Sequence, residues 1–256
     1  HYDHILLATQ AGKHIFCEKP IDLSYEKVQT VKATIESAGI HFMVGFNRRF
    51  DPHIQELKAA IDQGKAGSPR IVKITSRDPS PPSLEFIKHS GGLFLDMAIH
   101  DFDMARYLVG DEVVQVSSTG NIFGDLPLAQ FDDIDTAVTT LIFKKGCMVQ
   151  IDNSRYSSYG YDQRLEVFGQ NGKEATQNIL ENTIETSDAS GHHTARSKLF
   201  FIERYADSYR NILMDFVATL KNKQAPSISV KDGLAALVIA MAAKQSLKEN
   251  RSISLS

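Results

Sequence analysis

Residues 14–45 read HIFCEKPIDLSYEKVQTVKATIESAGIHFMVG, and this stretch determines how the chain begins to fold. His14 to Cys17 forms a short, largely apolar segment typical of a buried strand. Ser24 is a good N-cap for a helix whose apolar positions recur at helical spacing and which Gly39 ends. Ile40 to Val44 has the composition of the next strand. A strand, a helix and a strand joined by short connections predict a parallel pair with a right-handed crossover.

The pattern changes after Gly45. Asp51-Pro52 is a typical cap and first turn of a helix, and most of the later short apolar segments alternate as strands do. We predict strands over Arg70–Arg77, Val113–Thr119, Ala137–Phe143, Cys147–Asn153 and Arg164–Phe168, with weaker ones to about Thr186. The sequence therefore indicates an α/β start followed by an α+β domain with a mostly antiparallel, open-faced sheet, and the break falls near Gly45.

Three further helices are expected in this second region. They cover Leu93–Val109, Arg204–Leu220 and Lys231–Lys248, and the last is apolar on most faces, which predicts burial. The segment Asp188–Lys198, which contains His192-His193, has the composition of a solvated loop.

The composition excludes several classes of protein. The chain has 28 Lys and Arg against 31 Asp and Glu, a net charge of −3, which argues against binding to nucleic acid. Its longest apolar run, Leu234 to Ala243, is too short for a membrane span. The two cysteines, Cys17 and Cys147, cannot form a disulfide framework or a Cys-rich zinc site and fit free thiols in the cytoplasm.

Residues 91–108 read GGLFLDMAIHDFDMARYL and combine apolar character with ionisable groups. On one continuous helix, Asp96, His100 and Asp103 would lie within about 60° of one another. Buried charges without partners are costly, so this stripe needs an explanation. It could be a catalytic pair in which His100 acts as acid and base and Asp96 tunes it. It could also be part of a metal site that takes a further ligand from elsewhere, or a structural network.

Polar residues also follow the two predicted parallel strands. Glu18-Lys19-Pro20 comes after the first strand, and Asn47 and Arg48 come after the second. Ligands of open α/β sheets bind beyond the carboxyl ends of the strands, so these residues could line a site. A surface turn at Lys19, and capping or salt bridging by Asn47 and Arg48, are the alternatives.

Two other segments could contribute polar groups to a pocket. These are Arg77-Asp78 and Tyr159-Gly160-Tyr161, and each is a weak signal alone. The chain contains neither a Gly-x-Gly-x-x-Gly fingerprint nor a glycine-rich phosphate loop followed by Lys-Ser/Thr.

Three of these motifs occur together and in order: Glu18-Lys19-Pro20, the turn at Gly45–Phe50, and the helix with Gly91-Gly92, Asp96 and His100. This combination resembles the glucose–fructose oxidoreductase/inositol dehydrogenase (Gfo/Idh/MocA) family and is closest to its inositol 2-dehydrogenase branch. The resemblance runs along the whole chain. It implies that residues 1–45 are the C-terminal part of a dinucleotide-binding Rossmann domain, whose glycine-rich turn we expect upstream, and that residues 46–256 bind substrate.

The resemblance also implies an activity. It points to an NAD- or NADP-dependent dehydrogenase that oxidises a secondary hydroxyl of a cyclic polyol or sugar. By this resemblance Lys19 contacts the reacting hydroxyl, and Asp96 and His100 are catalytic, with Asp96 orienting His100 and favouring its protonated form. A noncatalytic sugar-binding protein and a metal-dependent hydrolase are the alternatives.

The remaining expectations concern binding. We expect substrate contacts from Asn47, Arg77, Tyr161 and, by the resemblance, Asp103. Cofactor contacts are expected from Glu18, Lys19, Pro20 and Arg48, and no metal is expected. An open sheet face usually needs covering, and the family often pairs such faces, so we expect a homo-oligomer, a dimer or a tetramer.

Overall fold

The computed structural model describes residues 1–255. The chain begins with α1 (Tyr2–Gln10), β1 (Ile15–Cys17), α2 (Tyr25–Ala38) and β2 (Phe42–Val44). Strands β1 and β2 are parallel, in register from Ile15 beside Phe42 to Cys17 beside Val44. The predicted strand–helix–strand unit is therefore confirmed, whereas α1 was not predicted.

The ends of α2 form as the sequence predicts. The Ser24 hydroxyl accepts a hydrogen bond from the backbone N–H of Lys27, which satisfies one of the free donors of the first turn. Gly39 ends the helix with a φ of 64°, a left-handed conformation that glycine adopts without a steric penalty.

The rest of the chain is built on a sheet of seven strands in the order β11-β4-β5-β6-β3-β7-β8. Only β3 and β6 pair in parallel; the other neighbours are antiparallel, as expected. The strands are β3 (Pro69–Arg77), β4 (Val113–Asn121), β5 (Thr136–Phe143), β6 (Met148–Ser154), β7 (Asp162–Gly169), β8 (Lys173–Thr176) and β11 (Ile253–Ser254).

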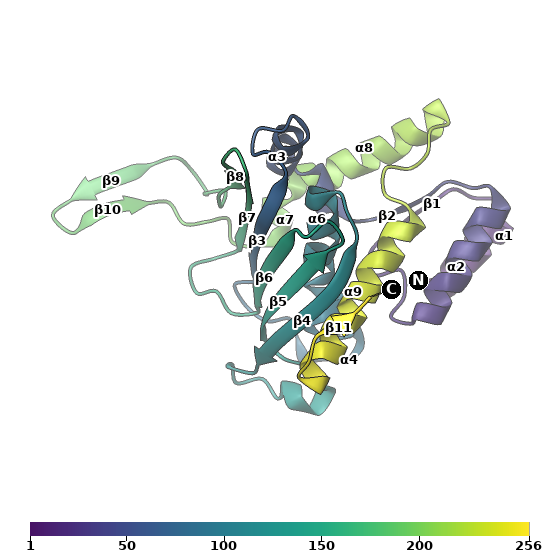
Figure 1. Cartoon of the computed structure of the whole chain (residues 1–256), viewed down its shortest axis with the longest axis horizontal. Helices are drawn as coiled ribbons and strands as arrows, with labels where there is room; N and C mark the ends of the chain where they lie inside the picture. The colour runs from purple at the N-terminus through teal and green to yellow at the C-terminus, as the bar shows by residue number, and fades with distance from the viewer. Residues whose placement is uncertain (256) are drawn as a thin grey trace.

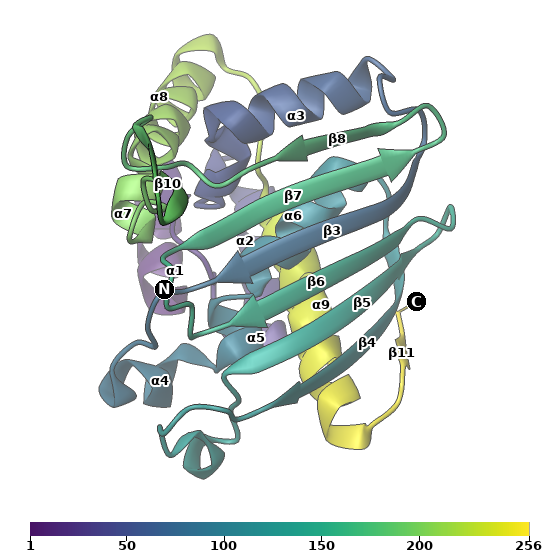
Figure 2. The ribbon, with the colours of Figure 1, turned by 90° about the vertical axis from the view of Figure 1, so that its left-hand side faces the viewer.

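One face of this sheet is covered by helices and the other is open (Figures 1 and 2). Buried residues alternate along β5 with exposed or half-buried ones, as a sheet with one packed face requires. The packed face lies against α6 (Ile99–Val109) and α9 (Val230–Glu249). The open face carries a cross-strand row of apolar residues, in which Ile71 lies between Met148 and Phe168.

Helix α9 lies between the sheet and the first strands (Figure 1). It packs against β4 and α6 on one side and against α2 and β2 on the other. Gly233 allows this close approach, because a Cβ there would lie 2.6 Å from the Ile21 side chain. The position of β2 relative to the sheet is thereby fixed by the core of the protein.

Two predictions of secondary structure are wrong in detail. The helix expected over 93–109 is divided into α5 (Leu93–Asp96) and α6. The backbone N–H of Ala98 donates to the carbonyl of Leu93, five residues back, and this changes the hydrogen-bond register between the two helices. The loop expected over 188–198 contains part of a hairpin, β9 (Glu185–Asp188) and β10 (Gly191–Thr194), which projects away from the body (Figure 1).

The remaining elements are short connections and outer helices. They are η1 (Asn47–Phe50), α3 (Pro52–Asp62), α4 (Leu84–Ser90), η2 (Leu128–Phe131), α7 (Phe201–Arg204) and α8 (Ala206–Asn222). Within residues 1–255, none of the helices is both long and apolar enough to cross a bilayer.

Candidate active site

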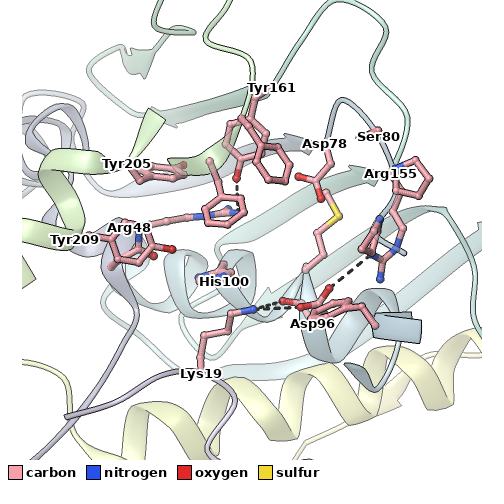
Figure 3. Close-up of a pocket in the computed structure, with 17 residues that line it drawn as sticks. Lys19, Arg48, Asp78, Ser80, Asp96, His100, Arg155, Tyr161, Tyr205 and Tyr209 are labelled. Atoms are coloured by element: carbon pink, nitrogen blue, oxygen red, sulfur yellow. Dashed lines mark hydrogen bonds and ion pairs between the residues drawn. The ribbon is translucent and has the colours of Figure 1, made fainter. Parts of the chain in front are cut away.

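A cavity of about 360 Å³ lies where the carboxyl ends of β1 and β2 face the sheet domain (Figure 3). This volume falls within the range of about 300–1,000 Å³ typical of small-molecule sites. Its polar lining comes from segments far apart in the sequence: Lys19, Asn47, Arg48, Asp78, Ser80, Asp96, His100, Arg155, Tyr161, Tyr205 and Tyr209. Pro81, Pro82, Phe86, Met97, Phe200 and Phe201 supply apolar walls.

Lys19 and Asp96 form an ion pair at the floor of this cavity. The Lys19 ammonium donates to the Asp96 backbone carbonyl at 2.6 Å and lies 3.4 Å from Oδ1 of the same residue. Burial lowers the pKa of Lys19, and the negative charge of Asp96 opposes that effect. The ammonium is thus held in place by one aspartate while it faces the cavity (Figure 3).

His100 lies in the first turn of α6, with its ring at the cavity (Figure 3). Its Nδ1 is buried and has no hydrogen-bond partner, and its ring packs edge-on to Phe46. Burial, together with the cations Lys19 and Arg48, holds the pKa of His100 well below its usual range. The imidazole is therefore neutral at pH 7 and can accept a proton.

The expected pairing of Asp96 with His100 is wrong. The carboxylate of Asp96 faces Lys19 on one side and Arg155 on the other, at 3.4 and 3.6 Å. The break between α5 and α6 accounts for this, because it ends the continuous helix on which the two side chains would have met. Asp96 therefore orients the lysine rather than the histidine, and nothing in this arrangement favours a protonated imidazole.

Arg48 and its partners form a second part of the cavity wall. The Arg48 guanidinium donates to Asp101 at 2.6 Å and to the Tyr161 hydroxyl at 3.4 Å. Asn153 donates to the second oxygen of the Asp101 carboxylate, so this buried charge is fully bonded. Arg48 is held rigidly as a result. The neighbouring Asn47 also lines the cavity, and its Nδ2 is buried without a hydrogen-bond partner.

Several predicted site residues do not line the cavity. Asp103 lies further along α6, where both of its oxygens bind Arg49, at 2.5 and 2.8 Å. Arg77 binds Asp152 and Tyr159 instead. Glu18 and Pro20 flank Lys19 in the chain without reaching the cavity wall. The structure thus brings together Lys19, Asn47, Arg48, Asp96, His100 and Tyr161 of the predicted residues.

The two residues at the end of β3 illustrate why adjacent residues differ. Successive side chains of a strand point to opposite faces of the sheet. Arg77 therefore points to the open face and Asp78 to the packed face, where it lines the cavity. By the same alternation, Arg155 continues the buried positions Ile151 and Asn153 of β6. That alternation is a signal in the sequence that could have identified Arg155.

Tyr205 is a further cavity residue that the sequence did not single out. It lies between α7 and α8, and its ring packs edge-on to Tyr161 at 6.1 Å between centroids. Tyr205 falls at helical spacing before the apolar positions of α8, so in the sequence it cannot be distinguished from a core residue.

Asp78 gives a testable effect on stability. Burial raises the pKa of Asp78 to about 6, although Arg48 and Arg155 oppose the rise. Above this pH the folded protein contains a poorly solvated carboxylate that the unfolded chain hydrates freely. We expect Asp78→Asn to increase the free energy of unfolding near neutral pH by at most about 3 kcal/mol. Because a raised folded-state pKa lets the wild type bind a proton as the pH falls, the gain should fade from about pH 6 to about pH 4. Urea unfolding at several pH values measures it, and a gain independent of pH would contradict this explanation.

Several nitrogens around the cavity lack hydrogen-bond partners. Asn47 Nδ2, His100 Nδ1 and two nitrogens of Arg155 are buried without hydrogen-bond partners. Such groups are costly unless a ligand with oxygen acceptors supplies the missing bonds. Residues 1–255 contain no group of three or more His, Cys, Asp or Glu side chains arranged to hold a metal ion. The cationic and hydroxyl groups of the lining, from Lys19, Arg48 and three tyrosines, fit a small ligand with several oxygens.

Comparison with known proteins agrees with this geometry. The model of an oxidoreductase family with an NAD-binding Rossmann fold matches residues 1–46, and that of the GFO/IDH/MocA C-terminal domain matches residues 54–173. The myo-inositol 2-dehydrogenase of Thermotoga maritima is 45% identical over 255 residues, which is 100% of this chain and 76% of that protein.

Two solved structures are similarly close in fold. A myo-inositol dehydrogenase from Corynebacterium glutamicum has a TM-score of 0.96 and 39% identity, and the match covers 100% of this chain and 77% of that one. The scyllo-inositol dehydrogenase of Lactobacillus casei, solved with NAD(H) and scyllo-inositol, has a TM-score of 0.91 and 29% identity, over 99% and 76% of the two chains. With these matches, the Rossmann-type strands, the mostly antiparallel sheet and the cavity between them show that this chain belongs to the GFO/IDH/MocA family of NAD-dependent oxidoreductases.

Proposed function

We propose that the protein oxidises a secondary hydroxyl of an inositol-like cyclic polyol to a ketone. The observation that carries this proposal is the half-buried imidazole of His100 in one cavity with the ammonium of Lys19, which Asp96 holds in place. A base and a positively charged donor in one cavity are what removal of a hydroxyl proton requires. The similarity to inositol dehydrogenases of three organisms supports an inositol as the substrate.

The residues of the cavity have distinct roles in this reaction. His100 accepts the proton of the reacting hydroxyl. Lys19 donates a hydrogen bond to the oxygen as negative charge develops on it, and Asp96 holds the lysine for this task. When bound, the nicotinamide supplies the acceptor for the hydride that leaves the same carbon.

Other groups would select and orient the ligands. Asn47, whose amide nitrogen is unpaired, and Tyr161 are placed to bond further ring hydroxyls. Lys19 and Arg48 lie at the carboxyl ends of β1 and β2, where dinucleotide ligands of such sheets bind. We therefore assign the cofactor contacts on this edge to Arg48 and to the turn of Glu18 and Pro20, and we assign Lys19 to the reacting hydroxyl.

We also propose how the chain is divided into domains and how copies of it assemble. Residues 1–45 would complete the dinucleotide-binding domain, and residues 46–256 would form the substrate-binding domain. The open sheet face, with exposed Met148 and Phe168, would be covered by a second copy of the chain in a homo-oligomer. Both cysteines are free thiols, which fits a cytoplasmic enzyme.

An absorbance assay of reduced cofactor tests the proposed activity. The purified full-length enzyme would be incubated with NAD or NADP and with myo-inositol, scyllo-inositol or glucose, and with lactate as a control that has one hydroxyl and no ring. We expect reduction of the cofactor with at least one inositol and none with lactate. Binding of inositol without any reduction would instead identify a noncatalytic polyol-binding protein and overturn the proposal.

A further inference from the structure

Arg155 has the largest side chain among those that are fully buried. It follows β6 directly, and its backbone N–H donates to the carbonyl of Asp135 at 2.8 Å. Its guanidinium lines the cavity close to Asp96 (Figure 3). An arginine is rarely buried without paired partners, so its contacts need an explanation.

The guanidinium lies between two carboxylates without forming a short bond to either. Its Nη1 is 3.6 Å from Oδ2 of Asp96, and its Nη2 is 3.8 Å from Oδ2 of Asp133. The Nε and Nη2 atoms of Arg155 and the Oδ2 atom of Asp133 have no hydrogen-bond partner. Such incomplete pairing is a poor source of stability, and it points to a role in the site.

Asp133 binds the N-terminal end of α5, the short helix that ends at Asp96. Its Oδ1 accepts a hydrogen bond from the backbone N–H of Leu93, the first residue of α5, at 2.7 Å. Gly92 makes this contact possible, because its φ is +86° and a Cβ there would lie 2.6 Å from that oxygen. The pair of Asp133 and Arg155 thus faces both the first and the last residue of α5.

The last residue of α5 is Asp96, and its carboxylate is shared between two cations. Oδ1 lies 3.4 Å from the Lys19 ammonium, whereas Oδ2 lies 3.6 Å from Arg155. Each oxygen therefore faces one cation, and the orientation of the carboxylate depends on both. Loss of Arg155 would free one oxygen and allow the carboxylate to rotate.

We propose that Arg155 is a positioning residue, which fixes the carboxylate of Asp96 so that one oxygen alone serves Lys19. The proposal rests on the proposed dehydrogenase activity. It assigns Arg155 no direct contact with the reacting atoms: it acts on Lys19 through Asp96.

The charges around the two cations set the expected direction of a pH effect. Lys19 faces Asp96, Arg48, Glu18 and the titratable imidazole of His100. Arg155 faces Asp96, Asp133 and Asp78. Without Arg155, the negative charge of Asp96 would stabilise the Lys19 ammonium alone. The positive charge of Arg155, which repels that ammonium, would also be gone. Lys19 would then keep its proton to a higher pH.

The test compares Arg155→Met, Arg155→Lys and the wild type in the full-length enzyme, with inositol and NAD. We expect Arg155→Met to lower the turnover number by about 10- to 100-fold, the scale found when a residue that orients a metal ligand is lost. We expect the alkaline limb of its pH–rate profile to move up by about one unit. Arg155→Lys should restore most of the turnover and the original limb. Arg164→Met, in an arginine half-exposed and bonded to Asp162, is the matched control.

Asp133→Asn provides a second test if Arg155→Met does not fold. The amide oxygen of asparagine still accepts the bond from Leu93, but the negative charge facing Arg155 is removed, so the alkaline limb should move down. Wild-type turnover with an unmoved limb in Arg155→Met would overturn the proposal. If that variant does not fold, an unmoved limb in folded Asp133→Asn, together with low turnover in Arg155→Lys, would overturn it. A wild type that oxidises no polyol would instead refute the proposed activity on which it rests.

Discussion

Replacing His100 with alanine is expected to reduce the turnover number for inositol oxidation by about 10²- to 10⁴-fold, the usual contribution of a general base. The imidazole lines the cavity and is neutral at pH 7, because its pKa is held well below the ordinary range, and no other histidine of residues 1–255 lines this cavity. Removing it leaves the hydroxyl proton without an acceptor. Steady-state assays of reduced cofactor, compared at saturating polyol and NAD, measure the loss.

The control for this variant is His89→Ala. His89 lies on α4 with its side chain 78% exposed, so its replacement should leave turnover unchanged. The unfolding temperature of both variants should remain close to that of the wild type. Near-normal turnover in His100→Ala would remove His100 from the mechanism.

The second large effect is expected at Lys19. Lys19→Met should lower the turnover number by about 10²- to 10³-fold, the scale for loss of one donor to a developing oxyanion. The Kd for NAD should change little, because the ammonium is bound to Asp96 and faces the reacting oxygen. Turnover assays together with NADH fluorescence titration separate the two effects.

Lys19→Arg should be almost as inactive as Lys19→Met. The compact ammonium fits between the carbonyl and the carboxylate of Asp96, and the planar guanidinium fork cannot take the same position. Lys88→Met, at an exposed lysine of α4, is the control. A loss of cofactor affinity with normal turnover of the bound complex would show that Lys19 serves the dinucleotide and not the hydroxyl.

The sequence predicted the fold well where a local signal determines it. The cap at Ser24, the stop at Gly39 and the alternation along β5 depend on neighbours within a few residues, and all three occur in the structure. The hairpin of β9 and β10 was missed because its residues are polar and exposed on both strands, so no burial pattern marks it.

The site was predicted in part. Lys19 and Arg48 follow strands whose carboxyl ends meet, so their proximity follows from the topology. Asp103 was misplaced because its partner, Arg49, comes from another segment, and helical spacing carries no information about that contact. The division between α5 and α6 comes from the backbone hydrogen bond of Ala98 to Leu93, which helical spacing does not predict, and it decides whether Asp96 faces His100 or Lys19.

Arg155 was not predicted, because no single motif marks it as a site residue. Its position after β6 resembles that of Lys19 after β1, yet only the pairing of β6 with β3 and the contact with α5 bring it to the cavity. A pattern of buried alternation ending in an arginine is a usable signal, since a charge at a buried position requires a partner or a ligand.

Transfer of deuterium tests the central claim most directly. The full-length enzyme would be incubated with NAD and with myo-inositol that carries deuterium on its ring carbons, and the reduced cofactor would be analysed by NMR or mass spectrometry. We expect one deuterium, transferred from a ring carbon, in each reduced nicotinamide and one ketone in each oxidised ring. Reduced cofactor without deuterium, or no reduction of the cofactor by any inositol, would contradict it.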